Sequence, residues 1–115
     1  MPHASNNKSK FWVFTINNYT EENQSDLRAL GDDPAVSYLV FGREMGEEQT
    51  PHIQGYIEFR TRHTLSRVRR MFPRAHWERR RGSGIEASVY CQKDGDFEEF
   101  GVLAISKVWY PSEIN

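Results

Sequence analysis

Apolar and polar residues alternate along the chain in blocks that predict an α+β fold. Five blocks are rich in β-branched and aromatic residues, which favour strands. Three other blocks space their apolar residues at helical intervals, and Thr20 is the expected cap of the first helix. We expect strands at residues 11–16, 36–43, 51–60, 75–80 and 97–102, and helices at residues 21–30, 64–72 and 85–93.

The order of these elements predicts an antiparallel sheet of about five strands with the helices mainly on one face. The consecutive strands 36–43 and 51–60 are joined by a short loop, so they should pair antiparallel. If the helices gather on one face, the other face stays open to solvent. This layout resembles ferredoxin-like or RNA-recognition-like folds, in which a wet sheet face is available to a polymer.

The strand at residues 51–60 shows the clearest two-residue alternation. Such a strand has one face on a core and one face in water. The apolar face carries Ile53, Gly55, Ile57 and Phe59, and the polar face carries His52, Gln54, Tyr56, Glu58 and Arg60.

The length of 115 residues and the 13% aromatic content are those of one folded domain with one core. We expect a flexible tail at residues 1–9, the folded domain at residues 10–102 and a C-terminal extension at residues 103–115. The sequence has no signal peptide and no apolar run long enough to span a membrane. The single cysteine, Cys91, excludes an internal disulfide framework and indicates a reducing compartment.

Positive charge is concentrated in one stretch, although the net charge of the chain is only −1. Residues 60–81 contain nine arginines, no lysine and one acid, Glu78. Guanidinium groups bind phosphate oxygens in a planar, bidentate manner. We therefore expect this stretch to contact a nucleic acid; a solvated helix face is the alternative explanation of the same charges.

His52 and Gln54 leave the same face of the strand at residues 51–60, about 6.5 Å apart along it. If the preceding strand pairs antiparallel with this one, Glu44 lies beside His52. One carboxylate, one amide oxygen and one imidazole suit Mg²⁺ or Mn²⁺. The alternative is a polar His on a wet strand. Three other carboxylates compete with Glu44 for the same role: Glu47, Glu48 and Glu58.

Tyr90 and Lys93 are neighbours one turn apart on the expected helix at residues 85–93. A tyrosine hydroxyl is a poor nucleophile unless its phenolate is stabilised, which a nearby ammonium group and a metal ion would both do. A half-buried tyrosine with its hydroxyl in water is the alternative. Cys91 lies about 100° further round the helix and is expected to be a buried, inert thiol.

Three stretches, in order along the chain, resemble the three motifs of the rolling-circle replication initiators (Rep proteins) of small circular single-stranded DNA viruses. Phe14-Thr15-Ile16-Asn17-Asn18 resembles the first motif. Thr50-Pro51-His52-Ile53-Gln54-Gly55 resembles the second motif, which binds the metal. Val89-Tyr90-Cys91-Gln92-Lys93-Asp94-Gly95 resembles the third motif. The resemblance covers about residues 10–101 and is to the circovirus type. The family is the HUH endonucleases, and Gln54 stands where the name implies a second His, as it does in circovirus-like members.

The resemblance implies a sequence-specific, metal-dependent endonuclease and strand transferase that nicks single-stranded DNA at a stem-loop replication origin. It implies Tyr90 as the nucleophile of a 5′-phosphotyrosine intermediate, and Lys93 as its charge partner. It implies a Mg²⁺ or Mn²⁺ ion held by Glu44, His52 and Gln54, with Asp94 as a further candidate ligand. The expected DNA-binding residues are Phe14, Thr15, Asn17, Asn18, Arg60, Arg62, Arg69, Arg70, Arg79, Arg80 and Arg81.

Family members continue into a helicase domain. We therefore expect a longer, oligomeric parent protein that works in the host nucleus, and an isolated domain that is monomeric. Two other functions compete with this one. A non-catalytic, RNA-recognition-like module would bind single strands without chemistry, and a water-activating metal hydrolase would leave no protein–DNA adduct.

Overall fold

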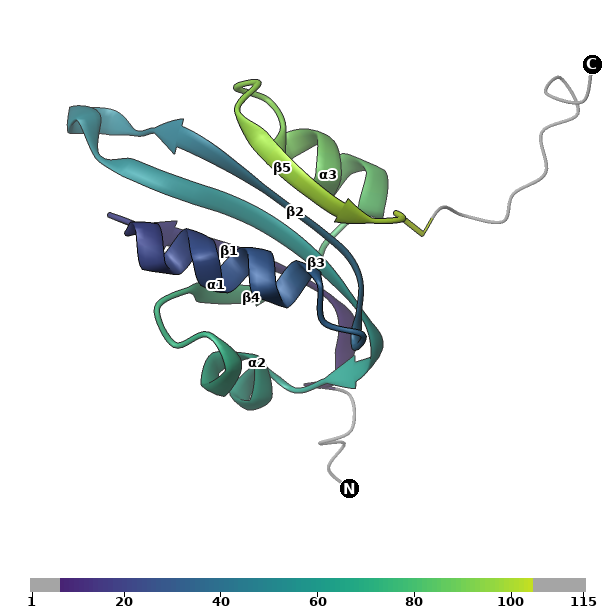
Figure 1. Cartoon of the computed structure of the whole chain (residues 1–115). Coiled ribbons are helices and arrows are strands. Elements are labelled where there is room, and N and C mark those ends of the chain that lie inside the picture. The colour runs from purple at the N-terminus through teal and green to yellow at the C-terminus, as the bar shows by residue number, and fades with distance from the viewer. Residues whose placement is uncertain (1–6, 105–115) are drawn as a thin grey trace, which may run out of the picture.

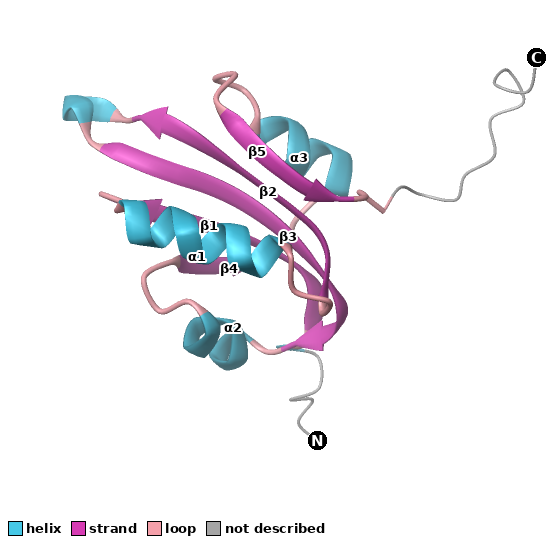
Figure 2. Cartoon of the chain, viewed as in Figure 1, coloured by secondary structure: helices cyan, strands magenta, loops and turns pink. Residues whose placement is uncertain are grey.

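The computed structural model describes residues 7–104 (Figure 1), so most of the expected tail at residues 1–9 and of the expected extension at residues 103–115 lies outside the described residues. The expected strands and helices are all present, with ends shifted by a few residues (Figure 2). The strands are β1 (Ser9–Asn17), β2 (Val36–Met45), β3 (Pro51–His63), β4 (His76–Arg79) and β5 (Phe97–Gly101), and the helices are α1 (Glu21–Gly31), α2 (Leu65–Met71) and α3 (Gly84–Cys91). A short 3-10 turn, Glu47–Gln49, lies between β2 and β3.

The five strands form one antiparallel sheet in the order β4-β1-β3-β2-β5. Strand β3 lies between β1 and β2, which α1 connects, and β1 lies between β3 and β4, which α2 connects. Two such split βαβ units define the ferredoxin-like layout, and β5 extends the sheet beyond β2. The α+β class and the antiparallel pairing of β2 with β3 are therefore confirmed.

The main hydrophobic core lies between the sheet and the two helices α1 and α2. Buried residues from four strands meet Leu27 of α1 and Val68 of α2 there. Helix α3 packs on the opposite face of the sheet, behind β5 in the view of Figure 1. Within residues 7–104, no helix has both the length and the apolar character needed to cross a membrane.

A second, smaller cluster of buried residues lies beneath α3, where the sequence predicted a wet surface and a single core. Its buried members are Tyr38, Val40, Tyr56 and Cys91. Tyr56 and Glu58 were expected to face solvent, and this expectation was wrong, because they are 0% and 1% exposed. The Glu58 carboxylate accepts hydrogen bonds from the Tyr56 hydroxyl (2.5 Å) and from the backbone N–H of Ala104 (2.9 Å), which compensates for its burial.

Two glycines allow close approaches across the sheet. A Cβ on Gly55 would lie 2.0 Å from the ring of Phe14, and a Cβ on Gly42 would lie 1.9 Å from the carbonyl oxygen of Cys91. The first contact seats Phe14 in the main core, and the second brings the C-terminal end of α3 directly onto β2. Any side chain at Gly42 would therefore displace α3 from the sheet.

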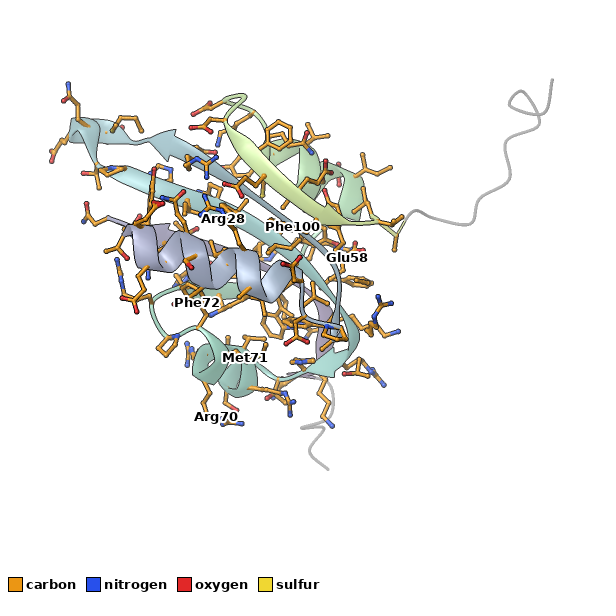
Figure 3. All side chains as sticks on the ribbon, in the orientation of Figure 1. Arg28, Glu58, Arg70, Met71, Phe72 and Phe100 are labelled. Carbon is orange, nitrogen blue, oxygen red and sulfur yellow. The ribbon has the colours of Figure 1, made fainter. Side chains whose placement is uncertain are left out.

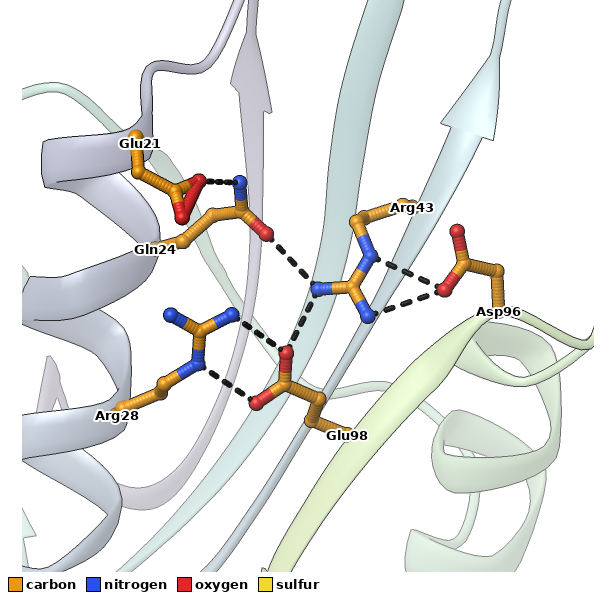
Figure 4. A network of polar contacts seen from close by, with 6 residues as sticks. All are labelled: Glu21, Gln24, Arg28, Arg43, Asp96 and Glu98. Carbon is orange, nitrogen blue, oxygen red and sulfur yellow. Dashed lines mark hydrogen bonds and ion pairs between the residues drawn. The ribbon is translucent and has the colours of Figure 1, made fainter.

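An ion-pair network ties α1 to the strands β2 and β5 (Figure 4). The Arg28 guanidinium donates two hydrogen bonds of 2.9 Å to the carboxylate of Glu98. Arg43 donates to the same carboxylate (2.8 Å) and to Asp96 (3.1 Å). The bonds from Arg28, supported by Arg43 and opposed by partial burial, lower the pKa of Glu98 to about 2. The network joins elements that are far apart in the sequence.

The lowered pKa of Glu98 predicts how the stability changes with pH. The ionised Glu98 carboxylate should stabilise the fold fully at pH values above 4.5, the ordinary pKa of the group. This stabilisation should be lost as the pH falls through about 2, because the carboxylate binds a proton in the unfolded chain before it does so in the folded protein. We expect Glu98→Gln to lower the free energy of unfolding at neutral pH, and the difference from the parent to shrink between pH 4.5 and 2. Urea unfolding at a series of pH values measures this, with Glu22→Gln, at an exposed position of α1, as the control. A difference that does not change with pH would contradict the assignment.

Candidate functional site

A carboxylate and an imidazole face each other at one end of the central strands. Glu44 of β2 pairs directly with His52 of β3 in the antiparallel register. The Glu44 Oε1 atom lies 3.0 Å from His52 Nε2, and Glu44 is only 9% exposed. Gly46 in the connecting loop packs against the imidazole ring, since a Cβ there would lie 3.0 Å from His52. The expected neighbourhood of Glu44 and His52 is confirmed.

Lys93, in the turn after α3, connects this pair to Tyr90. Its Nζ donates a hydrogen bond to Oε2 of Glu44, and the same Nζ lies 4.0 Å from the centroid of the Tyr90 ring. The Tyr90 ring and the Glu44 carboxylate are therefore only two contacts apart. Burial alone would lower the pKa of Lys93, but the hydrogen bond and the charge of Glu44 outweigh it and raise the pKa. Lys93 thus stays a cation between the two groups.

Helix α3 is fixed to the sheet by polar contacts on its buried side. Its first turn is closed by a capping box between Ser83 and Glu86. Ser88 lies 2.8 Å from the Tyr38 hydroxyl, which also donates to Glu99 (2.5 Å). Burial, together with that bond to Glu99, raises the pKa of Tyr38, so the hydroxyl keeps its proton.

Cys91 and Tyr90 are consecutive residues of α3, and their side chains differ sharply in exposure. Cys91 is 3% exposed, and burial raises the pKa of its thiol to about 12, which confirms the expectation of an inert, buried thiol. Tyr90 is 53% exposed. The phenol therefore faces solvent at the edge of the site and is accessible to a large substrate.

The end of β1 completes the site. Thr15 pairs with Gln54, and its Oγ1 donates a hydrogen bond of 3.2 Å to the Gln54 amide oxygen. Asn17 pairs with His52. The backbone N–H of Asn18 donates to the carbonyl of Pro51 (2.8 Å), where β3 begins. The first and second sequence motifs therefore meet side by side in the sheet.

A groove of about 300 Å³ runs from Tyr90 to strand β4. We call it the α3–β4 groove. Its polar lining residues are Gln54, Glu78, Arg79, Arg81, Glu86 and Tyr90. Two arginines and the exposed phenol thus border one open channel on the face of the sheet that carries α3.

Comparison with known proteins decides the family. The family model described as putative viral replication protein matches residues 9–94. This chain belongs to that family. The replication-associated protein of Beak and feather disease virus is 42% identical over 96 residues, which cover 84% of this chain and 33% of that protein. The master replication protein of Banana bunchy top virus is 42% identical over 100 residues, 83% of this chain and 32% of that protein.

The replication-associated protein of Porcine circovirus 1 is also similar, with 39% identity over 88 residues, 75% of this chain and 28% of that protein. The chain therefore spans about a third of the length of the curated relatives that it matches. The matched region contains β1 to α3, Tyr90 and Lys93. The resemblance to Rep proteins of circular single-stranded DNA viruses is confirmed.

The site brings together a mixed set of nitrogen and oxygen donors. Within the described residues, no three His, Cys, Asp or Glu side chains form a metal-binding group. Glu44, His52 and the Gln54 amide oxygen nevertheless share one end of one sheet face. This donor set suits a hard divalent ion. The Lys93 cation on Glu44 already marks the carboxylate as a place where positive charge is favourable.

The other candidate carboxylates lie elsewhere. Glu47 and Glu48 are exposed in the 3-10 turn, and Glu58 is buried against Tyr56. Asp94 is exposed, and residues 7–104 show no hydrogen bond or ion pair between it and Glu44 or His52. Of these acids, Glu44 is the one for which the described residues show a contact with His52.

The expected DNA-binding residues are distributed over the whole fold. Phe14 is 2% exposed and packs against Trp77 in the main core, so its side chain cannot contact DNA as we expected. Thr15, Asn17 and Asn18 lie at the site. Arg60 lies roughly 26 Å along β3 from His52, and its Nε donates to the carbonyl of Pro34 (2.7 Å).

The remaining arginines occupy four further places. Arg62 is on β3 beyond Arg60. Arg69 and Arg70 are on α2, which covers the face of the sheet opposite to α3. Arg79 and Arg81 line the α3–β4 groove. Arg80 donates to the Tyr56 hydroxyl (2.9 Å) and lies over the Phe11 ring (4.1 Å).

Sequence reasoning did not identify several residues that shape the site. Glu78 and Glu86 line the groove, and Ser88 and Tyr38 seat the helix. Glu78 had one available signal, because it is the only acid in the arginine-rich stretch. Ser88 could have been identified as a polar residue that lies one helical turn from Cys91, on the side of the helix expected to be buried.

The contact between Lys93 and Glu44 predicts a stability effect. Lys93→Met would leave the buried Glu44 carboxylate without one of its two partners, and we expect a loss of about 1–3 kcal/mol in the free energy of unfolding. Urea unfolding in the presence of a chelator measures this. Lys10→Met, at an exposed position of β1, is the matched control and should change little. Equal effects of the two substitutions would show that Lys93 does not stabilise Glu44.

Proposed function

We propose that this chain is the origin-nicking part of a viral replication protein, a single-stranded DNA endonuclease and strand transferase with Tyr90 as nucleophile. The observation that carries the proposal is the position of Lys93, whose Nζ contacts both the Glu44 carboxylate and the Tyr90 ring. This contact supports the proposal, because it links the solvent-exposed phenol to the side chains that we propose as metal ligands. The α3–β4 groove beside Tyr90 provides an open, arginine-bordered path for a substrate strand.

The proposed reaction is a transesterification. The Tyr90 oxygen attacks the phosphorus of the scissile phosphodiester, and the bond from phosphorus to the 3′ oxygen breaks. The phenolic proton is lost to solvent as the 3′ oxygen takes up a proton and leaves as a 3′ hydroxyl, so a 5′-phosphotyrosine ester remains on the protein. Because one phosphoester replaces another, a later 3′ hydroxyl can attack this ester and rejoin the strand without ATP.

Glu44, His52 and Gln54 would hold a Mg²⁺ or Mn²⁺ ion in this proposal. When bound, such an ion supplies Lewis-acid polarisation of a non-bridging phosphate oxygen. His52 would offer Nε2 as a lone pair, which requires the neutral tautomer with its proton on Nδ1. Lys93 would have to release Glu44, and its ammonium would then be free to stabilise the developing Tyr90 phenolate.

The proposed biological role rests on the relatives, which are named replication-associated protein and master replication protein. We propose that nicking takes place at a stem-loop origin in the host nucleus and that the released 3′ hydroxyl primes rolling-circle synthesis. Since the matched region covers only about a third of these relatives, we also propose a parent protein with a helicase domain that acts as an oligomer.

The competing binding-module function is less well supported. An RNA-recognition-like module would need the open sheet face, but α3 lies over the centre of that face, where Tyr56 and Val40 are fully buried. On this face, the end of the sheet near His52 and the side toward β4 are not covered by α3. That accessible region coincides with Tyr90 and its neighbours, which a purely binding module would not require.

Replacement of the proposed nucleophile gives a direct test of the chemistry. Tyr90→Phe should abolish the covalent protein–DNA adduct with an origin stem-loop oligonucleotide and Mn²⁺, while DNA affinity stays within about twofold, because only the attacking oxygen is lost. A denaturing gel detects the adduct, and fluorescence anisotropy measures the binding. Tyr19→Phe, which changes a tyrosine packed against the main core, is the matched control and should keep the adduct. An adduct formed by Tyr90→Phe would refute the assignment of the nucleophile.

Metal binding can be tested without activity. Mn²⁺ should raise the melting temperature of the parent by mass action. His52→Ala should lose most of this shift, because a nitrogen ligand is removed. Lys93→Met should show a larger shift than the parent, because no ammonium competes for Glu44. Differential scanning fluorimetry over a range of Mn²⁺ concentrations measures all three proteins. A shift that is the same in the parent and His52→Ala would exclude this metal site.

A further inference from the structure

A second and larger groove lies on the other face of the sheet. It has a volume of about 1010 Å³ and runs between α2 and β4. We call it the α2–β4 groove. Its floor includes Trp12, Leu65 and Trp77, which belong to the main core beneath α1 and α2. The α3–β4 groove instead has Val13, Ala87 and Cys91 in its lining, which belong to the cluster beneath α3.

The two grooves meet at the edge of the sheet. Strand β4 is the edge strand next to β1, so its outer side pairs with no other strand of the sheet. Glu78, Arg79 and Arg81 line both grooves. A chain lying in the α3–β4 groove can therefore continue over the β4 edge into the α2–β4 groove without leaving these residues.

The α2–β4 groove has a lining that suits a negatively charged polymer. Four arginines and one glutamate contribute to its lining: Arg69, Arg79, Arg80, Arg81 and Glu78. Arg69 and Arg81 are exposed and have no hydrogen-bond or ion-pair partner within residues 7–104, so their guanidinium groups are free to donate hydrogen bonds to a ligand. The hydroxyls of Thr64 and Ser66 add neutral donors to the same wall. This combination of charged forks and hydroxyls is typical of contacts to a phosphodiester backbone.

We propose that the α2–β4 groove binds the sugar-phosphate backbone of a single DNA strand that continues from the α3–β4 groove around the edge of β4. The proposal rests on the proposed function, because it takes the substrate strand to lie beside Tyr90. A single strand is required, since duplex DNA has a persistence length of about 150 base pairs and cannot bend around one β-strand. Arg69 is the key contact, because it lines only the α2–β4 groove.

Binding of oligonucleotides of increasing length tests this path. The experiment uses Tyr90→Phe as the background, so that no strand is cleaved, and extends a short strand one nucleotide at a time on each side of the cleavage position. Arg69→Gln should bind the shortest strands normally and become several-fold weaker once the strand is long enough to pass β4. At those lengths the slope of log affinity against log salt should fall by about 0.7, which corresponds to one lost phosphate contact on a single strand.

Arg70→Gln is the matched control. Arg70 is the neighbour of Arg69 on α2 and was among the expected DNA-binding residues, but it projects away from the sheet and lines neither groove (Figure 3), so the proposed path does not include it. The Arg70→Gln variant should therefore bind strands of every length with the same affinity as the background protein. Fluorescence anisotropy at several salt concentrations measures all three proteins.

Four outcomes would overturn the proposal. Equal losses in Arg69→Gln and Arg70→Gln would show a general charge effect. If Arg69→Gln already binds the shortest strands more weakly, Arg69 contacts the strand at the cleavage position itself. If Arg69→Gln loses no affinity at any length, the strand does not pass through the α2–β4 groove. A duplex extension that gains as much affinity as a single-stranded one would exclude a strand bent around β4. Failure of the background protein to bind any strand would instead refute the proposed function.

Discussion

The Glu44 carboxylate is the group on which the site depends. It is almost fully buried, and its two oxygens contact His52 of β3 and Lys93 after α3, so one side chain joins three elements of the fold. A buried carboxylate needs such partners, because an unpaired charge away from water is strongly unfavourable. The position of α3, and with it the position of Tyr90, is therefore coupled to the same group that we propose as a metal ligand.

This coupling explains why the sheet carries helices on both faces. Helices α1 and α2 cover the main core, whereas α3 brings Tyr90 and Lys93 to the end of the sheet where Glu44 and His52 meet. The Gly42 position makes the approach possible, since the backbone of Cys91 lies directly on β2 there. What stays open is the region between α3 and the edge strand β4. This open region borders Tyr90, where the proposed chemistry needs access for a substrate.

The sequence was sufficient for the elements, their order and the pairing of Glu44 with His52, because hydrophobic periodicity and a short connection determine these locally. It could not predict the burial of Tyr56 and Glu58, since alternation shows which residues share a face and not which helix covers that face. The contact of Lys93 with Glu44 is tertiary and has no local signal. The arginines of residues 60–81 are contiguous in sequence, but β3, α2 and β4 distribute them over different surfaces.

The most direct measurement for the central claim is the anomalous scattering of Mn²⁺ in crystals of this protein. The account predicts an Mn²⁺ peak in contact with the Glu44 carboxylate, His52 Nε2 and the Gln54 amide oxygen, with Lys93 Nζ moved off Glu44 and still beside the Tyr90 ring. Crystals saturated with Mn²⁺ in which Lys93 stays on Glu44 and no ion contacts His52 would contradict it.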